Sequence, residues 1–346
     1  MSPPMPATYY RPIPESDVAL GRAGLSLAGT RLRFERVEVL SRGQLPRVVP
    51  ADTVPAEILA RMTEPRAAIT GVSLGRPRLM GILNVTPDSF SDGGVFDGPD
   101  AAVAAALRMV EDVDILDIGG ESTRPGAADV PAPAEIARTA PVIAALSRAG
   151  VPVPVSIDTR KAAVARAAFD AGATIVNDVS GLGYDPDLAP LVAATGAPVC
   201  IMHSIATPAT MQDDPRYDDV LLDVFDFLEQ RIALAESCGI PRARIVVDPG
   251  IGFGKTVAHN LALLARVSLF HTLGCAILLG VSRKRFIGGI GGAAEPRSRG
   301  PGSIAVALAA MAQGVQILRI HDTSETAQAL KLYLAATTGK APGETI

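Results

Sequence analysis

The chain has 346 residues, of which 48% are hydrophobic and 20% charged, and this predicts one large domain with an appended segment, or two domains. The formal net charge of −4 argues against a duplex-binding protein, and an aromatic content of 4% with no Trp argues against base-stacking surfaces. Three widely spaced cysteines exclude a disulfide framework. We expect neither a signal peptide nor a membrane span, and therefore a cytoplasmic protein.

Residues 1–75 differ from the rest of the chain, because they are rich in Pro and Arg and poor in Ala-rich stretches. Residues 32–40 predict an edge strand, and residues 55–62 predict a short helix with proline at its start. We interpret residues 1–75 as a small appended α/β unit or a partly ordered arm of unknown role, and residues 76–346 as the main domain.

From residue 79 onward, a short apolar run, a polar loop and an amphipathic stretch alternate. Eight runs are apolar throughout, as expected of strands buried on both faces: 79–83, 115–118, 153–157, 175–176, 198–202, 245–247, 277–281 and 317–318. Helices are predicted between and after them, including 101–111, 160–171, 220–237, 303–313 and 323–334, the last capped by Thr323 or Ser324.

Eight strand–helix repeats over roughly 260 residues predict an α/β fold of the (β/α)8 TIM barrel type, with a small N-terminal appended segment. The alternative is an open, doubly wound sheet. That fold would need a Gly-rich phosphate turn after its first strand, and residues 84–88 (NVTPD) form no such turn.

Polar side chains follow every predicted strand, at the end where this fold carries its chemistry. A single Asp there can simply cap a helix, but a complete polar rim predicts a binding site. Asp158, Asn177 and Asp248 combine two carboxylates with an amide, which suits a flat heterocycle that presents both donors and acceptors. The rim comprises Asn84, Glu121, Ser122, Thr123, Arg124, Asp158, Thr159, Arg160, Asn177, Asp178, His203, Asp248, Ser282, Arg283, Lys284, Arg319, His321 and Asp322.

Positive charge gathers on the same rim. Arg124, Arg319 and His321 would lie beside the start of the last helix, and a cationic cluster there predicts a phosphate site. Asn84 and the Asp-containing loop after it offer hard oxygen ligands that suit Mg²⁺. The residues alone therefore predict a site for a polar heterocycle linked to a phosphate or a diphosphate.

Other motifs have simpler explanations. Residues 250–256 look like a P-loop, but the first glycine which that motif requires is Pro249 here, so we expect a tight turn below a flat ligand, with Phe253 over it. The cysteines are interpreted as core residues. His203 is interpreted as a core or supporting residue, and His259 and His271 as surface or helix-end residues.

Seven ordered motifs across residues 79–337 resemble those of the dihydropteroate synthase family of folate biosynthesis. They are LMGILNVTPDSFSDGG (79–94), DILDIGGESTRPGA (114–127), SIDTRK (156–161), IVNDVSG (175–181), VVDPGIGFGKT (246–256), GVSRKRFIG (280–288) and RIHD (319–322). The resemblance implies that p-aminobenzoate is joined to (7,8-dihydropterin-6-yl)methyl diphosphate, releasing pyrophosphate. It also implies small-molecule substrates rather than nucleic acid or membrane, a Mg²⁺ cofactor, and a homodimer formed through helices near the C-terminal end.

The resemblance further implies the roles of individual residues. Two loops, 87–94 and 122–126, would close over the site. Catalytic roles fall on Asn84, which also binds the metal, and on Asp92, Arg124, Lys284, Arg319 and His321. Substrate binding falls on Phe90, Thr123, Pro125, Asp158, Asn177, Asp248, Phe253, Lys284, Arg285, Arg319, Ile320 and His321.

Two departures from the family pattern stand out. Arg285 replaces a Ser found in many members near the aminobenzoate carboxylate; it could pair with that carboxylate or face solvent. Residues 202–208 keep the family's His and Thr-Pro but lack its usual Met and Gly between them, which leaves the form of this loop open. The alternatives are a pterin-binding methyltransferase barrel and a catalytically silent pterin-binding protein, and the motifs at 282–284 and 319–321 favour the synthase over the methyltransferase.

Overall fold

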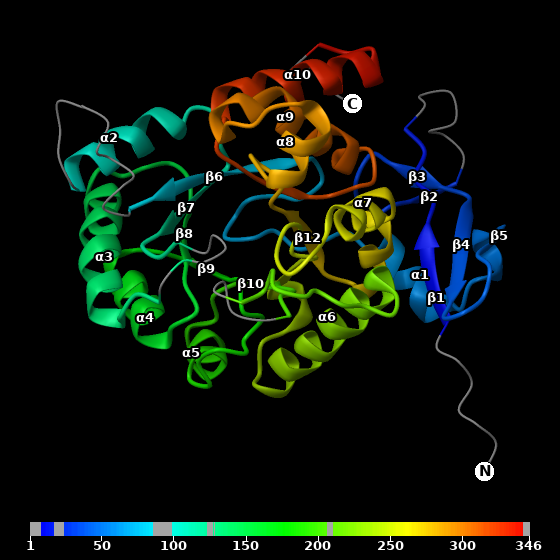
Figure 1. Ribbon diagram of the computed structural model, residues 1–346, viewed down its shortest axis with the longest axis horizontal. Helices are drawn as coiled ribbons and strands as arrows, with labels where there is room; N and C mark the ends of the chain where they lie inside the picture. Colours follow the sequence, from blue (N-terminus) through cyan, green and yellow to red (C-terminus); the bar gives the residue numbers. More distant parts are fainter. Residues whose placement is uncertain are drawn as a thin grey trace.

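The computed structural model describes residues 8–16, 24–85, 99–122, 127, 129–205 and 210–341. Eight parallel strands close into a barrel in which the last strand pairs with the first (Figure 1). This confirms the predicted (β/α)8 barrel. The strands are β6 (Arg78–Asn84), β7 (Ile115–Gly119), β8 (Val155–Asp158), β9 (Ile175–Asp178), β10 (Val199–Met202), β11 (Ile245–Asp248), β12 (Ala276–Leu279) and β13 (Ile317–Ile320).

Helices surround the barrel, and the main core lies between them and the strands. Local sequence fixes several of their ends. Asp219 accepts hydrogen bonds from the first main-chain N–H groups of α6, and Gly172 and Gly196 end α4 and α5 in left-handed conformations. The helices are α2 (Pro99–Met109), α3 (Ala132–Arg148), α4 (Ala162–Ala171), α5 (Leu188–Thr195), α6 (Val220–Ser237), α7 (Val257–Ala265), α8 (Arg285–Gly291), α9 (Gly300–Met311) and α10 (Thr323–Thr338), with 3-10 turns η3 (Arg242–Arg244), η4 (Val267–Leu273) and η5 (Pro296–Arg299).

Three predicted details are wrong. The helix predicted from residue 160 begins at Ala162, because the two preceding side chains enter buried ion pairs. The last helix is preceded by Asp322 at its N-cap rather than by Thr323 or Ser324, and the Asp322 carboxylate pairs with Arg283 instead of capping the helix. His271 is fully buried in η4, where its Nε2 lies 3.0 Å from the carbonyl oxygen of residue 313, and burial lowers its pKa to about 3.

The appended segment is a small unit built on an antiparallel sheet, β1 (Thr8–Pro12), β4 (Arg36–Ser41) and β5 (Arg47–Pro50). The strand predicted over 32–40 is therefore not an edge strand, because β4 pairs on both sides. The predicted short helix is α1 (Ala56–Thr63), with Pro55 at its N-cap. Remaining elements are β2 (Leu25–Ser26), β3 (Arg33–Phe34) and η1 (Ala51–Thr53).

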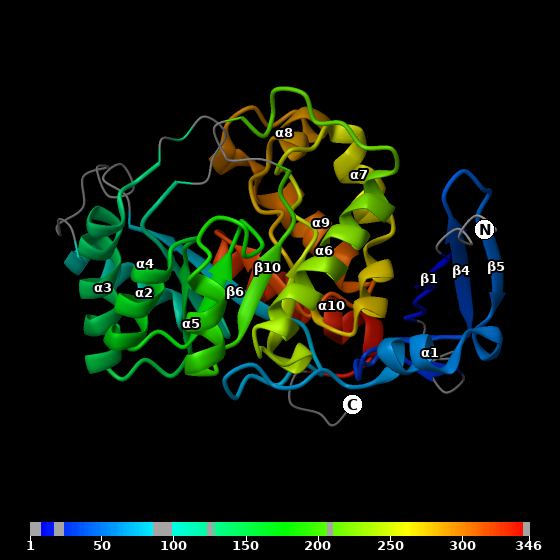
Figure 2. The same cartoon turned by 90° about the horizontal axis from the view of Figure 1, so that it is seen from below.

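This unit lies beside α6 and η4 (Figure 2). The Tyr9 hydroxyl donates to the Asp226 carboxylate at 2.9 Å, and its ring meets Phe225 edge-on. Arg42 pairs with Asp223 at 2.6 Å and with Asp226 at 2.7 Å. The unit is thus attached to α6 by apolar contact and by partly exposed ion pairs, and it also contacts η4.

The chain between this unit and β6 closes the amino end of the barrel, at the far side from α8 (Figure 2). Ile69 and Leu74 are each 2% exposed and share a core with the first residues of the strands. The predicted domain boundary at residues 75 and 76 stays a prediction, but these two side chains belong to the barrel core. Among the described residues, no helix is long and apolar enough to span a membrane.

We predict that Leu74→Ala lowers the free energy of unfolding by about 2–5 kcal/mol, because it leaves a cavity in this closed end. Urea unfolding followed by circular dichroism measures the change. Leu45→Ala is the matched control, since Leu45 is 94% exposed. Equal effects of the two substitutions would show that residues 66–75 do not complete the barrel core.

Candidate functional site

The three residues predicted to contact a heterocycle lie at the carboxyl ends of β8, β9 and β11, and β10 separates β9 from β11. Asp158 ends β8 and pairs in register with Asn177 of β9, while Asp248 ends β11. Their exposed fractions are 6%, 3% and 5%, so each polar group is held away from bulk solvent. Buried polar groups need partners, and the surrounding side chains supply them.

Arg319 on β13 is the centre of this cluster. Its Nε donates to Asp117 Oδ2 and its NH2 donates to Asp158 Oδ2, each at 2.6 Å. Asn177 Nδ2 donates to the same Asp117 oxygen at 3.0 Å. The predicted cationic residue is therefore fastened between two carboxylates, which lie on β7 and β8.

Asp117 is a site residue that the sequence analysis missed. It is fully buried, and its Oδ1 has no hydrogen-bond partner among the described residues. The signal was present, because an Asp interrupts the apolar run 115–118 inside a buried strand. Polar residues that directly follow a strand are a clearer sequence signal for this fold than a polar residue within a strand.

Burial sets the protonation of these groups. It raises the pKa of Asp158 from its ordinary value to about 7, although Arg319 opposes the shift, and it also raises the pKa of Asp248. For Arg319, burial lowers the pKa, but attraction to Asp117 and Asp158 outweighs it and the net shift is upward. Burial lowers the pKa of Lys284 to about 8, while Asp248 raises it.

The segments after β11 and β12 meet at the mouth of the barrel. The Lys284 ammonium lies 4.2 Å from the centroid of the half-buried Phe253 ring, a cation–π contact. Arg285, the first residue of α8, is exposed. Ser282 Oγ lies 3.0 Å from His321 Nδ1 and also accepts from the His321 main-chain N–H at 3.1 Å.

Other rim residues have structural roles or lie outside the description. The side chain of Ile320 packs in the main core, so only its main chain can face a substrate. Asp178 accepts from the main-chain N–H groups of Ser180 and Leu182 and closes a turn. The predicted residues that lie outside the described part of the chain are Phe90, Asp92, Thr123, Arg124 and Pro125.

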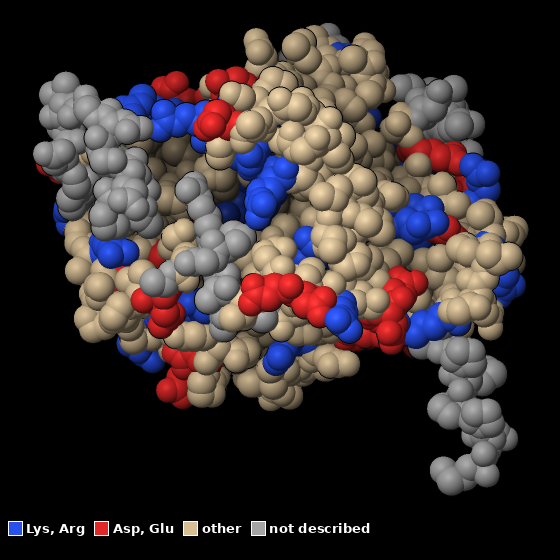
Figure 3. All heavy atoms as spheres, in the orientation of Figure 1, with Lys and Arg blue, Asp and Glu red and all other residues tan. Residues whose placement is uncertain are grey.

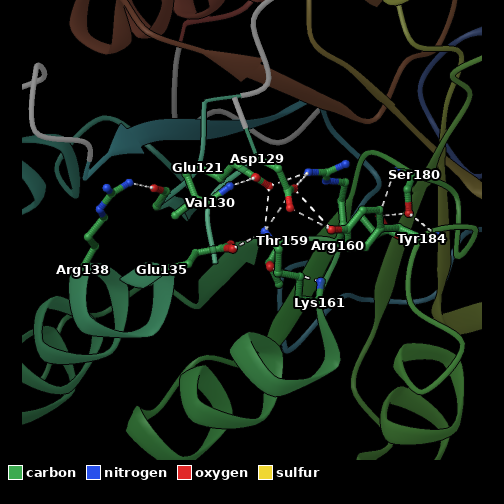
Figure 4. Close-up of polar contacts among 12 residues, drawn as sticks. Glu121, Asp129, Val130, Glu135, Arg138, Thr159, Arg160, Lys161, Ser180 and Tyr184 are labelled. Atoms are coloured by element: carbon green, nitrogen blue, oxygen red, sulfur yellow. Dashed lines mark hydrogen bonds and ion pairs between the residues drawn. The ribbon is translucent and has the colours of Figure 1, made fainter. Parts of the chain in front are cut away.

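A buried ion network borders the site between β7 and β8 (Figure 4). Arg160 donates to Glu121 and to Asp129, both at 2.9 Å, and Lys161 donates to Glu121 at 3.1 Å. The Arg160 guanidinium also lies 4.2 Å from the Tyr184 ring centroid. These contacts join the segments that follow β7, β8 and β9.

One face of the molecule carries a hollow with charged side chains near it. On the face seen in Figure 3, the molecule is hollowed between the side of α3 and the side of α8, and basic side chains lie at the margin of the hollow. The described residues contain no group of three or more His, Cys, Asp or Glu that could hold a metal. A metal here would need oxygen ligands from elsewhere, and Asn84 at the end of β6 offers one amide oxygen.

Comparison with known proteins matches residues 80–321 to the family described as pterin binding enzyme. Dihydropteroate synthase of Escherichia coli K12 is 43% identical over 272 residues, which cover 78% of this chain and 95% of that protein. A probable bifunctional folylpolyglutamate synthase/dihydropteroate synthase of Haloferax volcanii is 50% identical over 75% of this chain, but the match spans only 30% of that protein. The solved Xanthomonas albilineans dihydropteroate synthase with 4-aminobenzoic acid superposes with a TM-score of 0.74 at 46% identity, over 79% of this chain and 98% of that one.

We predict that Asp158→Asn changes the pH dependence of stability. Folding raises the pKa of Asp158 to about 7, so the folded protein holds a proton that the unfolded chain lacks between about pH 4 and pH 7. The free energy of unfolding contributed by this group therefore falls as the pH rises through that window, by up to about 1.4 kcal/mol per pH unit.

The Asn variant lacks this slope. Urea unfolding of both proteins from pH 4.5 to pH 7.5 measures the difference, with the exposed Asp52→Asn as the control. Parallel pH profiles for the wild type and Asp158→Asn would contradict a buried, proton-binding Asp158.

Proposed function

The chain belongs to the dihydropteroate synthase family of pterin binding enzymes, and we propose that it joins p-aminobenzoate to (7,8-dihydropterin-6-yl)methyl diphosphate, giving 7,8-dihydropteroate and pyrophosphate. The bond between the methylene carbon and the diphosphate oxygen breaks, the amino nitrogen of p-aminobenzoate forms the new C–N bond, and that nitrogen loses a proton. The observation that carries the proposal is the buried Asp158–Asn177–Asp248 group at the carboxyl ends of the barrel strands.

These three residues suit the amino-pyrimidinone edge of the pterin. Carboxylate oxygens accept from ring and amino N–H groups, and the amide supplies a donor and an acceptor. Lys284 lies near enough to Asp248 for their charges to interact, and in our proposal its ammonium contacts the pterin carbonyl and a ring nitrogen. Matched polar groups in a buried pocket discriminate strongly, because an unmatched group there loses its partner.

Arg319 and His321 are proposed to bind the diphosphate, together with Thr123. Negative charge develops on the departing pyrophosphate, so a fixed guanidinium stabilises the transition state more than the ground state. The two carboxylates bound to Arg319 hold its side chain in place before the substrate arrives. In this proposal Arg319 also orients Asp158 toward the pterin, which couples recognition of the ring to departure of the leaving group.

We propose Mg²⁺ as the cofactor, with Asn84 as its protein ligand. An amide oxygen is a hard ligand, and Mg²⁺ commonly takes one or two protein ligands while phosphate oxygens and waters complete its shell. The lack of an acidic or histidine cluster among the described residues fits an ion held chiefly by the substrate. When bound, the ion would neutralise charge on the diphosphate.

The p-aminobenzoate is proposed to lie against Phe253 and Lys284, with Phe90, Pro125 and Arg285 completing the pocket. Its amine is already nucleophilic, so the reaction needs no strong general base. We propose catalytic roles for Asp92 and Arg124 on the two loops after β6 and β7, which would help to exclude water from the electrophilic methylene carbon.

We further propose a cytoplasmic homodimer. Ile290 on α8 and Leu332 on α10 are 63% and 65% exposed, and apolar side chains on these late helices support an interface there. Sedimentation velocity at micromolar concentration tests this assembly.

An assay of pyrophosphate release, with and without p-aminobenzoate, tests the main proposal. We expect product formation that depends on p-aminobenzoate, and competitive inhibition against it by a sulfonamide, which presents a similar aniline. A methyltransferase barrel or a silent pterin-binding protein would release no pyrophosphate, and that result would refute the synthase.

We predict that Asp248→Asn weakens pterin binding by about 1–3 kcal/mol while leaving the fold intact, because the amide nitrogen would face a pterin N–H donor. Calorimetry with a free pterin measures the affinity, and circular dichroism checks the fold. Asp52→Asn, at an exposed position, is the control. An unchanged affinity in Asp248→Asn would mean that another group contacts this edge.

A further inference from the structure

Lys255 is a buried charged side chain with no part in the roles proposed above. It is 4% exposed, and its Nζ lies 2.9 Å from His203 Nδ1, 3.0 Å from the Gly250 carbonyl oxygen and 2.9 Å from the Phe253 carbonyl oxygen. A lysine ammonium has three N–H donors, and these three acceptors use all of them. His203 is therefore neutral, with its Nδ1 as the acceptor; burial and then the Lys255 charge lower its pKa to about 2.

Two of the three residues bound by Lys255, His203 and Gly250, also bind Asp248. The main-chain N–H of His203 donates to the Asp248 carbonyl oxygen at 3.0 Å. The main-chain N–H of Gly250 donates to the Asp248 carboxylate oxygen Oδ1 at 2.7 Å. Lys255, His203, Asp248 and Gly250 thus form a closed ring of hydrogen bonds, in which one link fixes the Asp248 main chain and another fixes its carboxylate.

The turn after β11 has little room to rearrange around this ring. Gly250 adopts φ +68°, and a Cβ atom there would lie 2.0 Å from the His203 carbonyl oxygen. Other side chains hold the far part of the turn: Gln212 donates to the Gly252 carbonyl oxygen at 2.8 Å, and Tyr217 donates to that of Gly254 at 2.7 Å. Lys255 holds the near part, next to Asp248.

The charge of Lys255 acts on Asp248 as well as on the three acceptors. Burial of an ammonium is unfavourable, and burial accordingly lowers the pKa of Lys255 to about 7 while Asp248 raises it. An apolar side chain of similar length would avoid that desolvation but would leave the three acceptors without a donor. The positive charge also favours the ionised form of Asp248, which is the form that accepts hydrogen bonds, against the burial that raises the pKa of Asp248.

We propose that Lys255 is a positioning residue, which fixes the Asp248 carboxylate for pterin recognition through His203 and Gly250. This inference rests on the proposed function, because Asp248 is there the group that contacts the pterin. It assigns the lysine of the turn to the orientation of a substrate-binding carboxylate rather than to a phosphate.

Lys255→Met tests the proposal. Calorimetry of the full chain with 6-hydroxymethylpterin and, separately, with inorganic pyrophosphate gives two affinities, and thermal unfolding checks that the variant is folded. We expect the Kd for the pterin to rise about tenfold, which corresponds to one lost positioning hydrogen bond, while the Kd for pyrophosphate changes less than about twofold. Lys331→Met is the matched control, because Lys331 is exposed on α10.

The outcomes distinguish a failure of the proposed function from a failure of the positioning role of Lys255. A wild-type protein that binds no pterin and releases no pyrophosphate refutes the proposed function itself. An active wild type with a folded Lys255→Met that keeps its pterin affinity, or loses both affinities equally, refutes the positioning role.

If Lys255→Met does not fold, a pair of His203 variants tests the positioning role instead. His203→Leu removes the acceptor for Lys255, whereas the amide oxygen of His203→Asn can replace Nδ1 as that acceptor. We expect His203→Leu to weaken pterin binding and His203→Asn to stay near the wild type. Equal losses in the two variants would overturn the inference.

Discussion

The site depends on carboxylates that are buried at the carboxyl ends of a closed barrel and kept there by a cation. Arg319 bridges Asp117 and Asp158 at 2.6 Å each, across strands that surround the same interior. A buried carboxylate without a partner is strongly unfavourable, so the barrel can present these groups to a ligand only while the bridge holds. The same bridge joins β13 to β7 and β8.

Lys255 is a second buried cation, and it supports Asp248 as Arg319 supports Asp158. Lys255 lies behind Asp248 and binds it through His203 and Gly250, while Lys284 stands at the mouth over Phe253. Each carboxylate proposed to contact the pterin is therefore also bound by another group of the protein, Asp158 by Arg319 and Asp248 by Gly250. In our proposal, recognition of the flat polar ring falls on residues at the strand ends.

The sequence predicted those features of the site that depend on short, continuous stretches of the chain. Short apolar runs identified the barrel strands, and polar residues directly after them identified Asp158, Asn177 and Asp248. Asp117 was missed because it lies inside an apolar run, and the role of Lys255 was missed because its partner His203 is 52 residues away. The prediction of an edge strand over residues 32–40 was wrong for the same reason, since the strands that pair with β4 are separate in the chain. From the sequence alone, Ile69 and Leu74 look like linker residues. The structure shows that they pack in the core at the closed end of the barrel.

A crystal structure of the complex with a pterin would show whether the buried carboxylates bind the ring. We expect the amino-pyrimidinone edge to lie within about 2.7–3.2 Å of oxygen or nitrogen atoms of Asp158, Asn177 and Asp248, with Arg319 still bound to Asp117. A pterin bound at another place on the molecule, or in this hollow with its polar edge turned away from those three side chains, would contradict this expectation.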